Sequence, residues 1–188
     1  AESRYPKVPG VLLELLSHQN YNDMRYGLDP RVKFTVSRAI YKSMLRFIHA
    51  QYGTEYVVQP LPVQSMQMNR TENEITIHWE PTIDPLESTA TPTYYIIYTR
   101  QDNGDWDNGT RIINTTYSFT ATTGIRYDFR VVAGNAGGIS MPSEVLSAYI
   151  SPEEKAQVLV LHGFTRVSGP EWFEDSIYAG IKPQSHAV

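Results

Sequence analysis

The stretch Gly124-Ile-Arg-Tyr-Asp-Phe-Arg-Val-Val-Ala-Gly-Asn135 decides the fold of the central part of this chain. Its large apolar residues Tyr127, Phe129 and Val131 recur at every second position, which is the period of a strand with one buried face. A turn cluster follows at once, because Asn135-Ala-Gly-Gly138 combines residues that favour tight turns. The stretch therefore predicts a core strand that ends in a turn.

Further strands are expected on both sides of this stretch. Ile75, Ile77 and Trp79 alternate with polar residues, which predicts another half-buried strand. Short runs rich in aromatic and β-branched residues continue the pattern between turn clusters, at Tyr94 to Tyr98, Thr110 to Ile113, Tyr117 to Thr120, Tyr127 to Ala133 and Ser143 to Ile150. The alternation leads us to expect Tyr94 and Tyr98 on the core side. Short strands at this spacing predict an antiparallel sandwich.

Residues 61–150 resemble a fibronectin type III domain. Ile75-Thr-Ile-His-Trp79 is similar to its second strand with the core Trp, and Tyr94-x-Ile96-x-Tyr98 is similar to its third. The most specific part is the stretch 124–135 followed by Gly138-x-Ser140-x-x-Ser143, which resembles the tyrosine corner, the sixth strand and the next loop. The resemblance implies an immunoglobulin-like sandwich.

The same resemblance makes two expectations about single residues. The hydroxyl of Tyr127 would bond to the backbone a few residues upstream, as in other tyrosine corners. Ala121 departs from the pattern, because that family usually has Leu at this position. The departure would weaken one core contact and leave the fold unchanged.

Residues 1–60 are expected to form a strand followed by a long helix. Val11-Leu-Leu-Glu-Leu-Leu16 is a nearly continuous apolar run, typical of a strand buried on both faces in a parallel sheet. Asp29-Pro30 offers an N-cap and a proline at the first helical position, and Gly53 offers a stop. The positions on one side of the helix recur three and four residues apart, at Phe34, Ser37, Ile40, Tyr41, Met44, Leu45 and Ile48, and all of them except Ser37 are apolar.

The charges exclude one class of function and point to no partner. The 188 residues include 16 Lys and Arg against 20 Asp and Glu and no Cys, so the chain is neither basic enough for a nucleic-acid binder nor built on disulfides. No apolar run is long enough to span a bilayer. Arg38, Lys42 and Arg46 recur every four residues on one side of the helix, and we expect that basic face to be solvated.

Residues 151–188 are expected to begin a third, incomplete domain. Val158-Leu-Val-Leu161 followed by His162-Gly163 predicts a strand that runs into a turn. This pattern is similar to the oxyanion-hole strand of α/β-hydrolases, but the sequence contains no Gly-x-Ser-x-Gly nucleophile motif. The run 158–173 more closely resembles the opening of the domain that follows fibronectin-like modules in multidomain cell-surface amidases of Gram-negative bacteria.

Residues 8–50 resemble the closing segment of zinc-dependent N-acetylmuramoyl-L-alanine amidases. The resemblance rests on Val11-Leu-Leu-Glu14, on Asn20 six residues later and on the helical run Val36 to Lys42. It implies that Glu14 is the general acid/base acting on a zinc-bound water, and that Asn20 lies in the substrate loop. Leu15 to His18 depart from the family pattern, which affects the expected substrate contacts.

The zinc itself is not expected in this chain. The amidase family uses two His and one Glu that would precede residue 1, so zinc would belong to a longer parent protein. His18, His49, His78, His162 and His186 lack the spacing of a zinc site. From the residues alone, Glu14 could equally be a solvated strand-edge carboxylate or the partner of a nearby cation; Arg25, Arg31 and Lys33 are the candidates.

The expected fold is mainly β: a fibronectin type III sandwich (61–150) between an N-terminal strand-plus-helix part of an α/β domain (1–60) and a C-terminal strand of a further domain (151–188). The expected parent is a periplasmic, cell-surface or secreted bacterial hydrolase that cleaves the N-acetylmuramoyl-L-alanine amide of peptidoglycan, and this piece alone would be inactive. Its partners would be peptidoglycan or another cell-surface glycan and the rest of the parent chain. The alternative is a non-catalytic adhesion or glycan-binding module, with Trp106 as a sugar-stacking residue.

Overall fold

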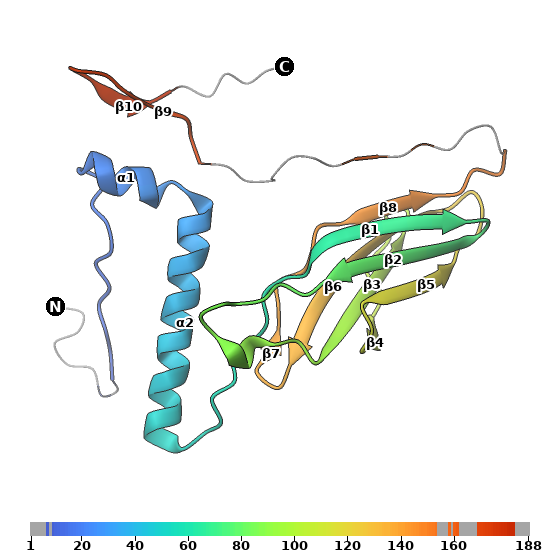
Figure 1. The fold of residues 1–188 in the computed structure, drawn as a ribbon, viewed down its shortest axis with the longest axis horizontal. Helices are drawn as coiled ribbons and strands as arrows, with labels where there is room; N and C mark the ends of the chain where they lie inside the picture. The colour runs from blue at the N-terminus through green and yellow to red at the C-terminus, as the bar shows by residue number, and fades with distance from the viewer. Residues whose placement is uncertain (1–6, 8, 154–157, 159, 162–168, 183–188) are drawn as a thin grey trace. The chain divides into compact units, whose positions relative to one another are not determined.

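The computed structural model describes residues 7, 9–153, 158, 160–161 and 169–182 (Figure 1). The chain divides into two compact units. The larger comprises residues 42–159, and the smaller comprises residues 1–41 together with residues 160–188.

The larger unit contains two antiparallel sheets. One has the strand order β1-β2-β5, formed by β1 (Gln64–Thr71), β2 (Glu74–Glu80) and β5 (Thr116–Thr120). The other has the order β4-β3-β6-β7, formed by β4 (Thr110–Ile112), β3 (Tyr94–Gln101), β6 (Arg126–Asn135) and β7 (Gly138–Ile139), and β6 also pairs with β8 (Leu146–Tyr149). A single turn of 3-10 helix, η1 (Ser88–Ala90), precedes β3. The predicted sandwich is therefore confirmed (Figure 1).

The core lies between the two sheets. Ile75, Ile77 and Trp79 on β2 are at most 1% exposed, which confirms the alternation predicted for this strand. Trp79 packs edge-on against Tyr95, with ring centroids 5.5 Å apart. The same buried cluster includes Tyr127, Phe129, Val131 and Ala133 of β6. Each large apolar side chain buried in this way stabilises the fold by about 1.5 to 3 kcal/mol.

The tyrosine corner is present as expected. The backbone N–H of Thr122 donates to the hydroxyl of Tyr127 at 3.2 Å, five residues along the chain. Gly124 has a φ of +81°, a conformation that glycine adopts without steric cost, and its N–H donates to the carbonyl of Ile150 at 2.8 Å. The small Ala121 is buried at the position where the resemblance implied Leu.

The predicted orientation of β3 is wrong. Tyr95 and Ile97 are the buried residues, with 5% and 1% of their surface exposed, whereas Tyr94 and Tyr98 lie on the outer face of the sheet. Successive side chains of a strand point to opposite faces. Because β3 carries large side chains at every position from Tyr94 to Tyr98, its sequence shows two apolar faces and does not say which one is buried.

β1 was not predicted as a strand, because its sequence is mostly polar. Among the strands that the structure describes, it is an edge strand that pairs with β2 alone, and all of its residues except Met66 and Met68 are exposed. These two methionines pack against the core. Two half-buried side chains are too few to produce a recognisable alternation in an eight-residue segment.

The smaller unit contains a short helix and a hairpin. In α1 (Tyr21–Gly27), the Asn20 side chain caps the helix by accepting from the N–H groups of Asn22 and Asp23. β9 (Trp172–Glu174) and β10 (Ala179–Ile181) pair in antiparallel fashion. The hydroxyl of Tyr21 donates to the carbonyl of Phe173 at 3.0 Å, and its ring packs edge-on against Trp172. Neither α1 nor this hairpin was predicted.

The long helix α2 (Pro30–Tyr52) confirms the prediction for this part of the chain. The Asp29 side chain accepts from the N–H of Arg31 at 2.9 Å, as an N-cap should. Gly53 ends the helix at a φ of +66°, and its N–H donates to the carbonyl of His49 at 2.9 Å. No residue of α2 is buried, although its apolar positions follow the helical period.

Neither apolar run that was predicted to be a terminal strand has strand structure at its described residues. Val11 to Leu16 has no regular secondary structure, and the exposed fractions of its apolar residues lie between 48% and 85%. Among the described residues no strand pairs with this run. A strand without a partner strand leaves its backbone N–H and C=O groups without hydrogen bonds to other strands. Val158, Val160 and Leu161 are also outside any strand and exposed. His162 and Gly163 lie outside the described residues.

Candidate functional site

The three residues singled out by the sequence lie in different settings. Glu14 is exposed and belongs to the irregular run before α1, so no strand positions its carboxylate. Asn20 is the N-cap of α1. Trp106 lies in the β3–β4 loop, where the guanidinium carbons of Arg100 and Arg130 lie 4.8 and 4.3 Å from its ring centroid. The structure brings none of these residues together, and their catalytic and binding roles stay predictions.

The zinc that the amidase resemblance implies has no fitting donor set in the described parts of the chain. No group of three or more His, Asp or Glu side chains there could hold a metal ion. His49 and His78 have other contacts, because their Nδ1 atoms lie close to the Thr54 carbonyl and to the Thr116 hydroxyl. The ligands of a zinc in a longer parent protein are not addressed by these residues.

Glu87 is the centre of the most developed polar site. It lies in the connection between β2 and β3, directly before η1, and its side chain is 6% exposed. A turn places it there, because the Asp84 side chain accepts from the N–H of Leu86 at 3.0 Å and the Asp84 carbonyl accepts from the N–H of Glu87 at 3.1 Å. A buried carboxylate is stable only when hydrogen bonds or opposite charges compensate its lost hydration.

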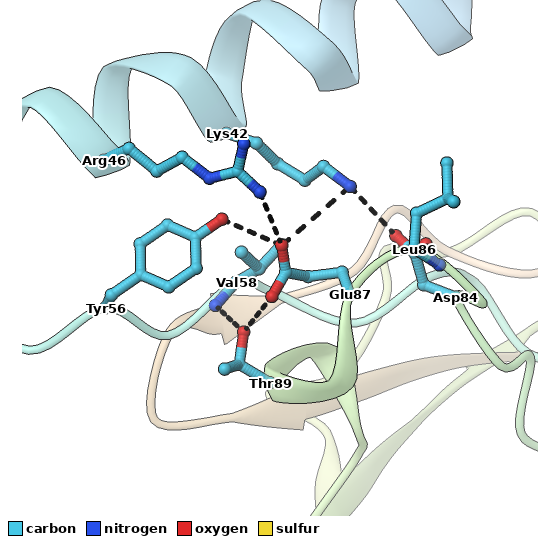
Figure 2. A network of polar contacts seen from close by, with 8 residues as sticks. All are labelled: Lys42, Arg46, Tyr56, Val58, Asp84, Leu86, Glu87 and Thr89. Carbon is cyan, nitrogen blue, oxygen red and sulfur yellow. Dashed lines mark hydrogen bonds and ion pairs between the residues drawn. The ribbon is translucent and has the colours of Figure 1, made fainter.

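Four side chains provide that compensation (Figure 2). The Tyr56 hydroxyl donates to Oε2 of Glu87 at 2.8 Å, and the Thr89 hydroxyl donates to Oε1 at 2.9 Å. Lys42 and Arg46 project from α2 toward the same carboxylate, and their nitrogens lie 3.9 and 3.7 Å from Oε2. The site thus joins α2, the segment after it and the β2–β3 connection through one carboxylate, and we call these five residues the Glu87 network.

A further carboxylate extends this charge cluster. Asp84 lies 3.8 Å from Nζ of Lys42, so the single ammonium of Lys42 is shared between Asp84 and Glu87. The side chain of Lys42 is only 13% exposed. The expectation of a solvated basic face on α2 is therefore wrong for Lys42. Arg46, in contrast, keeps most of its side chain in solvent while its guanidinium reaches Glu87.

The electrostatic balance keeps Glu87 ionised. Burial alone would raise the pKa of its carboxyl group, but the hydrogen bonds from Tyr56 and Thr89 and the charges of Lys42 and Arg46 outweigh it and lower the pKa. Burial and the hydrogen bond to Glu87 raise the pKa of Tyr56, so its hydroxyl remains a donor. At neutral pH the site therefore contains an ionised Glu87 carboxylate that accepts hydrogen bonds from Tyr56 and Thr89.

The segment between α2 and the first sheet is fixed by the same region. Val58 is fully buried, and its N–H donates to the Thr89 hydroxyl at 3.1 Å. The side-chain amide of Asn135, at the end of β6, donates to the carbonyls of Val58 and Thr89 at 2.8 and 3.0 Å. Gly137 lets this segment approach, since a Cβ there would lie 2.3 Å from the Val57 carbonyl oxygen.

Sequence reasoning identified some of these residues without their role. Asn135 and Gly137 were recognised as part of a turn cluster, and Lys42 and Arg46 as a helix face. Glu87 was missed, because a single Glu in a polar connection is indistinguishable from a solvated one. The available signal was a basic pair one helical turn apart, Lys42 and Arg46, and an acidic pair in the connection after β2, Asp84 and Glu87. The two pairs are distant in the sequence, and only the fold brings them together.

Comparisons with known proteins agree with the sandwich. Residues 61–149 match the family model of the fibronectin type III domain. The Caenorhabditis elegans protein described as "Titin homolog" is 26% identical and aligns with 59% of this chain, which spans only 1% of that relative's length. The family match begins at residue 61 and does not include residues 8–50, so the amidase resemblance of that segment stays a prediction.

Two solved structures similar to this chain contain fibronectin type III modules. A twitchin kinase region from Caenorhabditis elegans has 24% sequence identity and a TM-score of 0.45, and the match covers 53% of this chain and 18% of that one. The solution structure of a human fibronectin type III domain, the fourth of its protein, has 20% identity and a TM-score of 0.46, and the match covers 55% of this chain and 89% of that one.

Proposed function

We propose that the fibronectin type III domain at residues 61–149 is a spacer module of a longer polypeptide, and that residues 42–60 are a structured connection that fixes how the chain enters it. The observation that carries this proposal is the Glu87 network. One buried carboxylate binds side chains from α2, from the connecting segment and from η1. The proposed function is therefore mechanical: the module holds residues 42–60 in one orientation on its surface.

The connecting segment differs from a flexible linker. A flexible linker is rich in Gly and Ser, and its backbone is solvated. Here Val58 and Pro60 are buried against the domain, and the backbone groups of Val58 bond to Thr89 and Asn135. A buried charge with several committed donors also defines one geometry, because any other arrangement leaves it unpaired. These contacts support a fixed orientation of residues 42–60 on the domain.

The match to the titin homologue supports the modular part of the proposal. It covers 1% of a very long polypeptide, as expected for one module among many.

A distance measurement between two spin labels tests the fixed orientation. The chain has no Cys, so single cysteines at Gln51 on α2 and Gln67 on β1, both exposed, can be labelled selectively. We expect a narrow distance distribution in the wild-type background and a broad one after Glu87→Ala. Glu80→Ala is the matched control, because Glu80 is an exposed glutamate of the same domain. A broad distribution in the wild-type background would overturn the proposal.

The cell-wall hydrolase is the second proposal, and the resemblance of residues 8–50 supports it. In this proposal a longer periplasmic, secreted or cell-surface parent cleaves the N-acetylmuramoyl-L-alanine amide of peptidoglycan. Glu14 transfers the protons. Glu14→Ala should abolish stem-peptide release by the parent and leave its folding intact, whereas Glu72→Ala, an exposed glutamate of the β1–β2 turn, should not change it. Unchanged release by the Glu14 variant would remove this residue from the reaction.

A further inference from the structure

The arginines of the fibronectin type III domain gather on one face. Residues 61–150 contain five basic residues, all of them Arg, against ten acidic ones. Four of the five lie on the sheet that contains β3, β4 and β6, namely Arg100, Arg111, Arg126 and Arg130. The fifth, Arg70, lies on β1 of the other sheet. An acidic domain therefore presents a local concentration of guanidinium groups.

Aromatic rings hold three of these guanidinium groups in place. The guanidinium carbon of Arg111 lies 3.7 Å from the ring centroid of Tyr94. That of Arg130 lies 5.1 Å from the ring of Tyr98 and 4.3 Å from the ring of Trp106. Arg100 also packs against Trp106. Such contacts order long side chains before a ligand arrives, which lowers the entropy lost on binding.

The Trp106 ring is itself held over this face by its loop. The N–H of Asp107 donates to the carbonyl of Thr99 at 2.9 Å, and the Asp107 carboxylate accepts from the N–H groups of Thr99 and Gly109, both at 3.0 Å. Gly109 has a φ of +78°, and a Cβ there would lie 2.4 Å from the Ile96 side chain. The loop therefore lies directly on the outer face of β3.

The four arginines differ in their acidic partners. Arg100 and Arg126 share the buried carboxylate of Asp128, at 2.7 and 3.3 Å. Within the described residues, the contacts of Arg111 and Arg130 are with aromatic rings, and Nε of Arg130 is buried without a hydrogen-bond partner. Arg111 and Arg130 are therefore the cations of this face that a carboxylate from outside could neutralise.

The edge of the sheet adds backbone donors and acceptors beside Arg111. β4 is the last strand in the order β4-β3-β6-β7, so within the described part of the chain only its β3 side is paired. An extended peptide can pair with the other side of such a strand. In an extended peptide every second side chain points to the same face, so alternate carboxylates would lie over the arginine face.

We propose that the free edge of β4 and the adjoining outer face bind an extended acidic peptide segment, whose backbone pairs with that edge and whose carboxylates pair with Arg111 beside it. Charge complementarity and the free edge both favour a peptide. A neutral sugar is disfavoured, because guanidinium groups already lie against the rings of Tyr94, Tyr98 and Trp106 on which it would stack.

The test uses the full 188-residue chain and a short fluorescent peptide that alternates Glu and Thr, with a matched peptide that alternates Gln and Thr. Fluorescence anisotropy at low salt should show binding of the Glu peptide, and added salt should weaken it, because exposed charges are screened. The Gln peptide should bind at least about tenfold more weakly. Equal binding of the two peptides, or of neither, overturns the proposal.

Substitutions locate the site. Arg111→Gln should weaken binding by about tenfold, since it removes one charge-assisted pair. Arg111 is exposed, so this variant is expected to fold, and an unchanged thermal unfolding midpoint would verify it. Arg70→Gln is the control and should bind like the wild type. Equal losses in both variants, or binding of a heparin fragment without binding of the Glu peptide, would contradict the acidic-peptide assignment.

Discussion

Two apolar stretches of this chain have opposite environments. Val11 to Leu16 contains five large apolar residues and is exposed and irregular, whereas Ile75 to Trp79 contains three and is buried in a strand. The second stretch has partners, because β2 pairs with β1 and β5 and its inner face meets Tyr95 and Phe129 across the core. Apolar composition alone therefore does not bury a segment; a paired backbone and an opposing face do.

Two glutamates show the same contrast for charge. The amidase resemblance of residues 8–50 implied that Glu14 is the catalytic carboxylate, yet the run that contains it is exposed and irregular. Glu87 lies in a polar connection and was not predicted to be a site residue. It is buried, however, and its carboxylate accepts hydrogen bonds from the hydroxyls of Tyr56 and Thr89. The burial and the hydrogen bonds of a carboxylate depend on the residues that surround it in the fold. Its neighbours in the sequence do not show which residues those are.

Removing the core Trp should give the largest effect. Trp79→Ala empties a fully buried position and should lower the free energy of unfolding by about 3 to 5 kcal/mol. Leu13→Ala, in the exposed stretch, should change it by no more than about 0.5 kcal/mol. Urea unfolding monitored by far-UV circular dichroism measures both. A large loss for Leu13→Ala would show that residues 11–16 are buried in solution.

The pH dependence of Glu87 gives a smaller effect with a definite sign. Because the pKa of Glu87 is lowered on folding, its charge stabilises the protein above the ordinary pKa of about 4.3, and this contribution is lost as the pH falls through the folded value. Glu87→Gln does not titrate there. Its deficit in unfolding free energy relative to the wild type should be constant above about pH 5 and shrink at lower pH.

Asp128 is the internal control for that experiment. Burial alone would raise its pKa, but hydrogen bonds from Ser147 and Arg100 and the nearby arginine charges lower it. Both proteins contain Asp128, so its acid-induced loss cancels in the difference between them. A deficit that is independent of pH down to pH 3 would mean that the Glu87 carboxylate gains nothing from its cations in the folded state.

The tyrosine corner should give the smallest effect. Tyr127→Phe removes the acceptor of the Thr122 N–H and leaves the ring in the core, so the cost should be about 1 kcal/mol. Thermal unfolding with Tyr117→Phe as the control measures it, because Tyr117 is a partly buried tyrosine whose ring packs against the same core. An equal, negligible effect in both variants would show that the hydrogen bond contributes nothing.

The sequence predicted the sandwich well because its information is local. The alternation of Ile75, Ile77 and Trp79 and the turn after β6 each lie within a few residues, and each was found in the structure. The orientation of β3 was not predictable in the same way, because both of its faces carry large side chains. The polar edge strand β1 was missed for the opposite reason, since neither face shows a continuous apolar pattern.

The candidate site was not predictable because its contacts are distant in the sequence. Tyr56 and Glu87 are 31 residues apart, and Asn135 lies 77 residues from Val58. Each residue type is ordinary in its own segment, and the network exists only when three elements meet. The arginine face has the same character, because Arg111 and Arg130 come from different strands and neither forms a sequence motif.

The most direct test of the account is hydrogen exchange of the backbone amides in residues 42–52 of α2. We predict clear protection in the wild type, loss of most of it in Glu87→Ala, and no change in Glu80→Ala, with the amides of β6 protected in all three. This result would show that the Glu87 carboxylate attaches this part of the helix to the domain. Equal protection of residues 42–52 in the wild type and Glu87→Ala would contradict the central claim.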